Sequence, residues 1–311
     1  MSGTRGKRKP KPSVSIVGSG RLGTALAIAL SSLGYQIRSV VTRRQARAKR
    51  AASLVGDATA ALTADRLNLM PPSQIVFITT PDDIIGPTVE RLAKLQEQTL
   101  SGRVVLHVSG ALSSDILGPL ARKGSHVGSL HPLISVSDPQ TGAASLPGAF
   151  YCVEGDLVAT QTARRIVRDL KGEAFSIAGK DKPLYHAAAV MASGHVVALF
   201  DLAIEMLMQC GLSRGRARRA LLPLLESTMN NLSKFDPARA LTGTFARADI
   251  ATVQKHLQAL SKNNSSRAAE VYRALGMHAL DFMNQNGVAA GIVSEIRNVL
   301  EPPKKQSMGS R

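Results

Sequence analysis

Ser109 and His131 are polar residues at the ends of two predicted strands, where chemistry could take place. The tips of successive parallel strands lie on one side of a sheet, beside the crevice in which ligands bind. A histidine at this position could hydrogen-bond a substrate hydroxyl and take or give its proton, because the unperturbed pKa of histidine lies near neutrality. His131 could equally be a structural turn residue before Pro132, so the residues alone leave both interpretations open.

Lys182, His186 and Ser193 are predicted to share one face of a helix, because offsets of 4 and 11 residues bring helical side chains within a few tens of degrees of one another. The helix starts where a second domain is expected to begin. This face could therefore border the crevice between domains, which is a frequent ligand position. The same residues could instead form a polar stripe within a domain or dimer interface.

A glycine-rich turn, GSGRLG, occupies residues 18–23 between a predicted strand at 14–17 and a predicted helix at 22–33. In this context the first glycine permits a tight turn, the second lets the backbone approach a pyrophosphate, and the third lets the helix pack on the strand. The helix N-terminus adds free N–H groups and partial positive charge. We therefore predict that a dinucleotide contacts Gly18, Ser19, Gly20, Arg21, Leu22 and Gly23.

The type of dinucleotide is predicted from the end of the next strand, at 37–41. NAD-binding proteins usually place an acidic residue there for the ribose hydroxyls, whereas this chain has Thr42, Arg43 and Arg44. Two arginines suit a 2′-phosphate, which favours NADP over NAD. The alternative is that both arginines only begin the basic face of the following helix. Thr80 and Pro81, at another strand end, are expected to line the same crevice.

The elements that must position these residues alternate between strands and helices. This alternation predicts an α/β fold, an N-terminal Rossmann-type doubly wound parallel sheet followed by an all-helical C-terminal domain. We expect a basic disordered tail at 1–12, an NAD(P)-binding domain at 13–181, a helical substrate and dimerisation domain at 182–301, and a tail at 302–311. The predicted strands are 14–17, 37–41, 74–78, 104–108, 127–130, 150–153 and 174–177, with residues 56–62 as a connection.

The helical domain is predicted from a loss of strand signals after residue 182 and from helical periodicity at 183–209, 213–232, 249–260, 265–284 and 290–300. One stretch, residues 240–249, combines a glycine turn with threonines, an arginine and an aspartate that can cap a helix. Thr242 and Arg247 could hold a substrate anion there. Arg247 and Asp249 could equally only brace a helix junction.

Composition limits the class of protein. A hydrophobic content of 44% across 311 residues indicates a soluble two-domain chain, and two cysteines are too few for a disulfide framework. The formal net charge is +17, but much of it lies in the two tails, and the sequence has no nucleic-acid-binding motif. We therefore expect a cytoplasmic protein with no dedicated nucleic-acid partner, no membrane partner and no metal site.

Several segments together resemble a known family. They are VSIVGSGRLGTALA, FITTPDD, VLHVSGALSSDIL, GSLHPL, YHAAAVMASGH, LLPLLESTMNNL and ALTGTFARADIATVQKHLQAL. The combination is similar to bacterial Rossmann-like proteins that carry a domain of unknown function numbered 2520, from residue 13 to about residue 280. More distantly it resembles ketopantoate reductase, pyrroline-5-carboxylate reductase, 6-phosphogluconate dehydrogenase and prephenate dehydrogenase. The resemblance implies an oxidoreductase with a Rossmann domain and a helical domain that often dimerises.

The likeness to prephenate dehydrogenases bears on the site. Those enzymes also have a serine at the end of a core strand and, some twenty residues later, a Gly-x-His-Pro segment whose histidine contacts the reacting substrate hydroxyl. Ser109 and the segment around His131 are similar in order and spacing. The chain departs from its family at Ser193-Gly194-His195, where Ser-Asn-Tyr is usual, and around Arg247, where Gly-Pro-x-x-Arg-Gly-Asp is usual.

Together these features predict an NADP-dependent oxidoreductase that transfers hydride to or from a small, anionic metabolite. His131 would be the acid/base and Ser109 its partner, with Lys182 and His186 also catalytic, and Ser193, Thr242 and Arg247 would bind substrate. A homodimer through the helical domain is expected. The alternative is a non-catalytic NADP-binding sensor or scaffold that acts through its helical domain.

Overall fold

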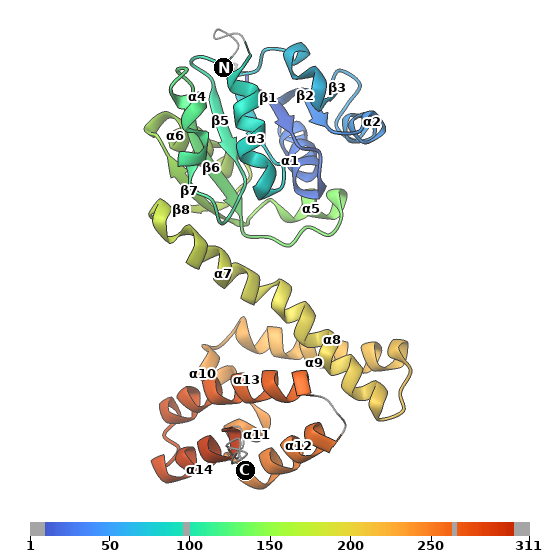
Figure 1. Ribbon diagram of the computed structural model, residues 1–311, viewed down its shortest axis with the longest axis vertical. Coiled ribbons are helices and arrows are strands. Elements are labelled where there is room, and N and C mark those ends of the chain that lie inside the picture. Colours follow the sequence, from blue (N-terminus) through green and yellow to red (C-terminus); the bar gives the residue numbers. More distant parts are fainter. Residues whose placement is uncertain (1–9, 96–99, 263–265, 302–311) are drawn as a thin grey trace, which may run out of the picture. The chain divides into compact units, whose positions relative to one another are not determined.

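The computed structural model of the chain describes residues 10–95, 100–262 and 266–301 (Figure 1). Most of the two predicted tails, residues 1–9 and 302–311, lies outside the described residues. The chain divides into two compact units, residues 1–193 and 194–311. The division falls twelve residues later than the boundary expected at 181/182, because the side chains of helix α7 (Lys182–Ala192) contact strands of the first unit.

The first unit contains an eight-stranded sheet with strand order β3-β2-β1-β4-β5-β6-β7-β8. Strands β1 to β6 run parallel, and the chain winds outward in both directions from β1, which is the doubly wound arrangement of a Rossmann fold. The predicted fold class is thus confirmed. The strands are β1 (Ser13–Val17), β2 (Gln36–Thr42), β3 (Ala60–Thr63), β4 (Ile75–Ile78), β5 (Val104–His107), β6 (His126–Pro132), β7 (Phe150–Gly155) and β8 (Glu173–Phe175).

Helices cover both faces of this sheet, so its central strands are apolar on both sides. In β1, for example, Val14 and Ile16 face one core and Val17 faces the other. One face packs against α1 (Arg21–Ser32), α5 (Pro139–Ser145) and α6 (Leu157–Asp169). The other packs against η1 (Ala64–Leu69), α3 (Asp82–Ala93), η3 (Ser114–Leu117) and α4 (Gly118–Ala121). Helix α2 (Gln45–Ser53) joins β2 to β3, and η4 (Gly179–Asp181) precedes α7.

Two features of the sheet differ from the sequence prediction. Strand β3 lies where a connection was expected, because pairing with β2 compensates for the weak strand preference of its alanines. Strand β7 runs antiparallel to β6, because residues 133–149 return the chain to the end of the sheet where β6 stops. There Leu133 N–H donates to the Phe150 carbonyl over 2.9 Å.

The second unit is helical. Its core is formed by Val253, Leu257, Leu280, Met283, Val293, Ile296 and Leu300. The predicted long helix 183–209 is interrupted at Ser193 (φ −129°, ψ −78°), after which α8 begins. The helices of the second unit are α8 (Gly194–Gln209), α9 (Arg214–Leu232), α10 (Pro237–Ala240), α11 (Gly243–Ala246), α12 (Ile250–Lys262), α13 (Ser266–Gln285) and α14 (Ala290–Leu300).

The stretch from Gly179 to Gln209 is long and apolar enough to cross a membrane, by length and composition alone. Its most apolar 18-residue window has a mean hydropathy of 1.8. Soluble proteins also contain single helices of this kind, so this is weak evidence for a span. Only 6% of its most apolar window is buried, so most of its apolar surface has no cover within the described residues.

The glycines of the turn after β1 give a test of the fold. A Cβ on Gly23 would overlap the Gly18 carbonyl oxygen and the Thr79 hydroxyl, whereas a Cβ on Gly20 would meet nothing within 4 Å. We expect Gly23→Ala to lower the free energy of unfolding by about 1–3 kcal/mol, the usual cost of overpacking. Gly20→Ala should change it by less than about 0.5 kcal/mol. Urea unfolding of both variants without ligand measures the difference, and equal values would contradict the packing described.

Candidate functional site

A cavity of ≈ 640 Å³ lies at the carboxyl ends of β1, β2 and β4, the point where the winding of the sheet reverses. Ligands of open α/β sheets bind at such a point. Most of the residues predicted to bind a cofactor line this cavity: Gly18, Ser19, Gly20, Thr42, Arg43, Arg44, Thr80 and Pro81. Arg21 lines an adjoining cavity of ≈ 430 Å³ instead, and Leu22 and Gly23 pack into the interior.

The cavity wall is strongly basic. Arg43 and Arg44 follow β2, Arg47 stands on α2 and Arg91 on α3, and all four side chains are exposed. Arg91 also donates to the Ala64 carbonyl. The sequence prediction did not place Arg47 or Arg91 at the site, because Arg47 matches the basic outer face of its helix and Arg91 is distant in sequence.

Two hydroxyl groups at the cavity lack internal partners. The side-chain oxygens of Ser19 and Thr80 are buried, and neither forms a hydrogen bond within the described part of the chain. Buried polar groups are normally hydrogen-bonded, so these two are available to a ligand. Gly20 adds a strip of backbone that a ligand can approach closely, since the space beside its Cα is open.

His131 lies near the end of β6, next to two side chains of α7. Its Nδ1 is 2.6 Å from the Tyr185 hydroxyl, and its ring meets the His186 ring edge-on with centroids 5.7 Å apart. Burial, followed by the charges of His186 and Lys182, lowers the pKa of His131 to about 4. The imidazole is therefore neutral at physiological pH.

Ser109, predicted to be the catalytic partner of His131, forms its side-chain hydrogen bonds with other groups in the described part of the chain. Its hydroxyl donates to Asp82 Oδ2 over 2.9 Å and accepts the N–H groups of Ala111 and Leu112 at 3.1 and 3.0 Å. These bonds shape the turn after β5 and tie it to the start of α3. Tyr185, which the sequence analysis did not single out, is the partner of His131 in the structure.

Lys182 is buried rather than presented to a substrate. Its side chain is 0% exposed, and Nζ lies 2.6 Å from Ser129 Oγ and 3.3 Å from Glu154 Oε1. Burial lowers the pKa of Lys182, and the charge of Glu154 offsets part of this effect. These contacts give Lys182 an anchoring role at the first turn of α7, and its catalytic role stays a prediction.

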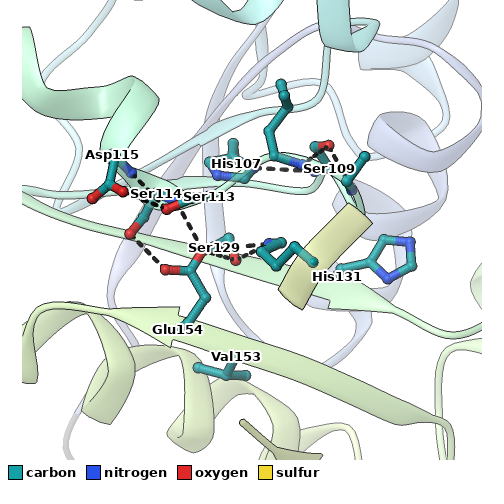
Figure 2. Close-up of polar contacts among 12 residues, drawn as sticks. His107, Ser109, Ser113, Ser114, Asp115, Ser129, His131, Val153 and Glu154 are labelled. Carbon is teal, nitrogen blue, oxygen red and sulfur yellow. Dashed lines mark hydrogen bonds and ion pairs between the residues drawn. The ribbon is translucent and has the colours of Figure 1, made fainter. Parts of the chain in front are cut away.

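Glu154, on β7, is the centre of this polar cluster and was missed by the sequence analysis. It accepts hydrogen bonds from the Ser114 N–H at 2.8 Å, the Ser114 hydroxyl at 2.6 Å and the Ser129 hydroxyl at 2.8 Å (Figure 2). Burial raises the pKa of Glu154, but the bonds from Ser114 and Ser129 and the charge of Lys182 lower it below its usual value. A single acidic residue in an otherwise apolar strand is a signal that could have identified it.

The predicted polar face of α7 does not form. Lys182 is buried, His186 is half-buried, and Ser193 is exposed with its hydroxyl bonded to the Ala189 carbonyl at 2.7 Å. His186 does contact the His131 ring, so the structure brings these two predicted residues together. Ser193 ends the helix instead of continuing its face.

Thr242 and Arg247 belong to the second unit, where they flank the short helix α11. Asp249 caps α12, because its carboxylate accepts the Thr252 N–H at 3.0 Å and the Thr252 hydroxyl at 2.7 Å. For residues 240–249 the sequence left two interpretations open, bracing of a helix junction and binding of a substrate anion. Asp249 braces the junction. Substrate binding by Thr242 and Arg247 remains a prediction.

Comparison with known families and structures identifies the class of protein. Residues 2–132 match a Rossmann-like domain and residues 149–279 match the domain of unknown function DUF2520. The chain is thus a Rossmann-like protein that carries DUF2520, as its sequence motifs predicted. It has no significant match among curated proteins.

Solved structures share the fold over most of the chain. A Bacteroides fragilis protein with a provisional NADP-oxidoreductase assignment is 20% identical, with a TM-score of 0.69 over 86% of this chain and 96% of its own. A Thermotoga maritima protein is 23% identical, with a TM-score of 0.64 and coverages of 92% and 98%. Plasmodium falciparum pyrroline carboxylate reductase is 14% identical, with a TM-score of 0.53 and coverages of 94% and 99%. At these identities the likeness establishes a shared fold.

The buried ion pair gives a prediction for stability. Lys182→Met keeps the volume of the side chain but leaves Glu154 without its counter-charge, so the free energy of unfolding should fall by about 3 kcal/mol. Chemical denaturation measures this change. Lys180→Met, at an exposed lysine two residues earlier, is the matched control and should change stability by less than about 0.5 kcal/mol. Similar stabilities for the two variants would show that the pair does not anchor α7.

His107 gives a prediction for pH dependence. It is buried on β5 and accepts the Ser109 N–H at Nδ1, and burial, followed by the charge of Lys182, lowers its pKa from 6.5 to about 4. The unfolded chain therefore binds more protons than the folded chain between these values, so stability is full above pH 6.5 and is lost as the pH falls toward 4.

Between about pH 7 and pH 5, the free energy of unfolding of His107→Asn should fall by about 2 kcal/mol less than that of the wild type. The reason is that asparagine keeps a hydrogen-bond acceptor but does not titrate. Urea unfolding at both pH values measures this difference. His195→Asn, which removes an exposed imidazole, is the control and should not reduce the loss of stability between the two pH values. An unchanged pH dependence in His107→Asn would contradict the lowered pKa.

Proposed function

We propose that this protein is an NADP-dependent oxidoreductase that transfers hydride to or from a small, anionic metabolite. The observation that carries the proposal is the cavity at the switch point of the sheet, with the glycine turn on one side and arginines on the other. The solved structures with the same fold support it, since the Plasmodium falciparum enzyme is described with NADP bound.

The residues present fit NADP. The N-terminus of α1 and the open backbone at Gly20 suit a diphosphate, and the unpartnered hydroxyls of Ser19 and Thr80 offer hydrogen bonds. Arg43 and Arg44 suit a 2′-phosphate, with Arg47 and Arg91 adding positive charge. When bound, NADP supplies the hydride donor or acceptor.

The chain's own contribution to the chemistry is centred on His131. In this proposal His131 holds a proton at the reacting substrate oxygen or nitrogen, and His186 stands beside it. The basic surface attracts an anionic substrate. Ser193, Thr242 and Arg247 are proposed to bind that substrate, with Arg247 pairing with its negative group.

The same proposal includes a cytoplasmic homodimer formed through the helical unit. Apolar side chains on α8 and α9 stand exposed, among them Val197 at 70% and Leu224 at 65%. Exposed apolar surface of this kind marks an interaction site, and a second copy of the chain offers a matching one.

A second candidate function, a non-catalytic NADP-binding sensor or scaffold, is favoured by one observation. Two residues predicted to be catalytic form bonds within the protein: Ser109 with Asp82, and Lys182 with Ser129 and Glu154. In such a protein the cavity would bind the nucleotide and the helical unit would engage a partner.

Nucleotide titration tests the proposal. We expect purified protein to bind NADPH more tightly than NADH, as followed by nicotinamide fluorescence. Arg43→Ala/Arg44→Ala should weaken NADPH binding at least about tenfold and leave NADH binding nearly unchanged, because bonds between charged groups contribute about 1.5–3 kcal/mol.

The matched control is Lys49→Ala/Lys94→Ala, which removes the same charge from exposed positions outside the cavity. If this control loses as much affinity for NADPH as the arginine variant does, the loss comes from the change in net charge and not from contacts of Arg43 and Arg44. Failure of both nucleotides to bind would refute the proposal. His131→Ala separates the two candidate functions, because an enzyme would lose turnover while still binding NADPH, and a sensor would show no substrate-dependent NADPH oxidation in either form.

A further inference from the structure

The surroundings of His131 determine which of its nitrogens carries the hydrogen. The Tyr185 hydroxyl lies 2.6 Å from His131 Nδ1, and burial raises the pKa of Tyr185, so the phenol keeps its hydrogen. Within the described residues the hydroxyl of Tyr185 has no other hydrogen-bonding partner. If the phenol donates to Nδ1, both groups are satisfied. The reverse arrangement would leave the phenol hydrogen without an acceptor in the protein.

With Nδ1 acting as an acceptor, the neutral imidazole carries its hydrogen on Nε2. The ring edge formed by Cε1 and Nε2 faces Gly110, at the turn after β5. A Cβ placed on Gly110 would lie 2.8 Å from His131 Nε2 and 2.5 Å from His186 Nδ1, so both nitrogens converge on the same small volume. His186 Nδ1 is buried and has no hydrogen-bond partner among the described residues.

We propose that His131 acts as a neutral hydrogen-bond donor, with its Nε2–H directed at an acceptor atom of the substrate, and that Tyr185 is the positioning residue that fixes this tautomer. An N–H group hydrogen-bonds a carbonyl oxygen or an imine nitrogen and polarises the C=O or C=N bond toward hydride addition, and the proton that completes the reduction comes from solvent water. A base that removes a hydroxyl proton would need a free lone pair at Nε2 instead. The inference rests on the proposed function and narrows the substrate class to ketones or imines that the protein reduces.

The anchoring of α7 supports this arrangement. Lys182 binds Ser129, which lies two residues before His131 on β6, and Tyr185 follows Lys182 by three residues on α7. The ion pair with Glu154 therefore fixes the helix turn that brings the phenol to Nδ1. The ring of Tyr185 also packs edge-on against Phe175, with centroids 5.9 Å apart, so its aromatic contact does not depend on the hydroxyl.

Nitrogen-15 NMR of the full chain, with isotope-labelled histidine at neutral pH, tests the inference directly because it reports the tautomer of each imidazole. We expect His131 to show an unprotonated Nδ1 and a protonated Nε2, both without ligand and with NADP⁺ added. Tyr185→Phe keeps the aromatic contact but removes the donor, so it should convert His131 to a mixture of tautomers.

The matched control is Tyr272→Phe, because the Tyr272 hydroxyl pairs with His256 Nδ1 over 2.9 Å in the second unit. It should leave the His131 signals unchanged. A protonated Nδ1 on wild-type His131, or an unaltered tautomer in Tyr185→Phe, would overturn the inference. The tautomer is measured without turnover and without bound nucleotide. A failure of this inference is therefore distinguishable from a failure of the chain to bind NADP.

Discussion

The ion pair between Lys182 and Glu154 is the interaction on which the arrangement around His131 depends. A fully buried ammonium group is costly unless it is paired, and here Glu154, which is only 12% exposed, supplies the charge while Ser129 supplies a hydrogen bond. Glu154 is held in turn by Ser114 at the opposite side of the cluster. The first turn of α7 is thereby fixed to β6 and β7, which places Tyr185 and His186 beside His131.

The winding of the sheet provides the second constraint. Because β1 lies between β2 and β4, the chain leaves it in two directions, and the carboxyl ends of these strands border one cavity. The glycine turn, the arginines after β2 and the hydroxyl of Thr80 meet there although they are far apart in sequence. The same edge of the sheet carries the turn at Gly110 and the end of β6, where His131 stands. One edge therefore combines a basic cavity for a nucleotide with a neutral imidazole.

Most of the fold could be predicted from the sequence, since each parallel strand is a short apolar run and the glycine turn stands in its usual context. The site was predicted only in part, because its hydrogen bonds join distant segments. Nothing local indicates that Ser109 binds Asp82, or that Lys182 lies buried against Ser129 and Glu154. Tyr185 stands beside His186 in a motif the sequence analysis noted, yet its role depends on how α7 packs on β6. The reversed direction of β7 likewise follows from the path of residues 133–149 rather than from local preference.

The most direct test of the account is a crystal structure of the chain with NADP⁺. We expect electron density for the nucleotide in the cavity at the carboxyl ends of β1 and β4, with its diphosphate over Ser19 and Gly20 and its 2′-phosphate against Arg43 and Arg44. Crystals saturated with NADP⁺ that show an empty cavity, or the nucleotide bound elsewhere, would contradict it.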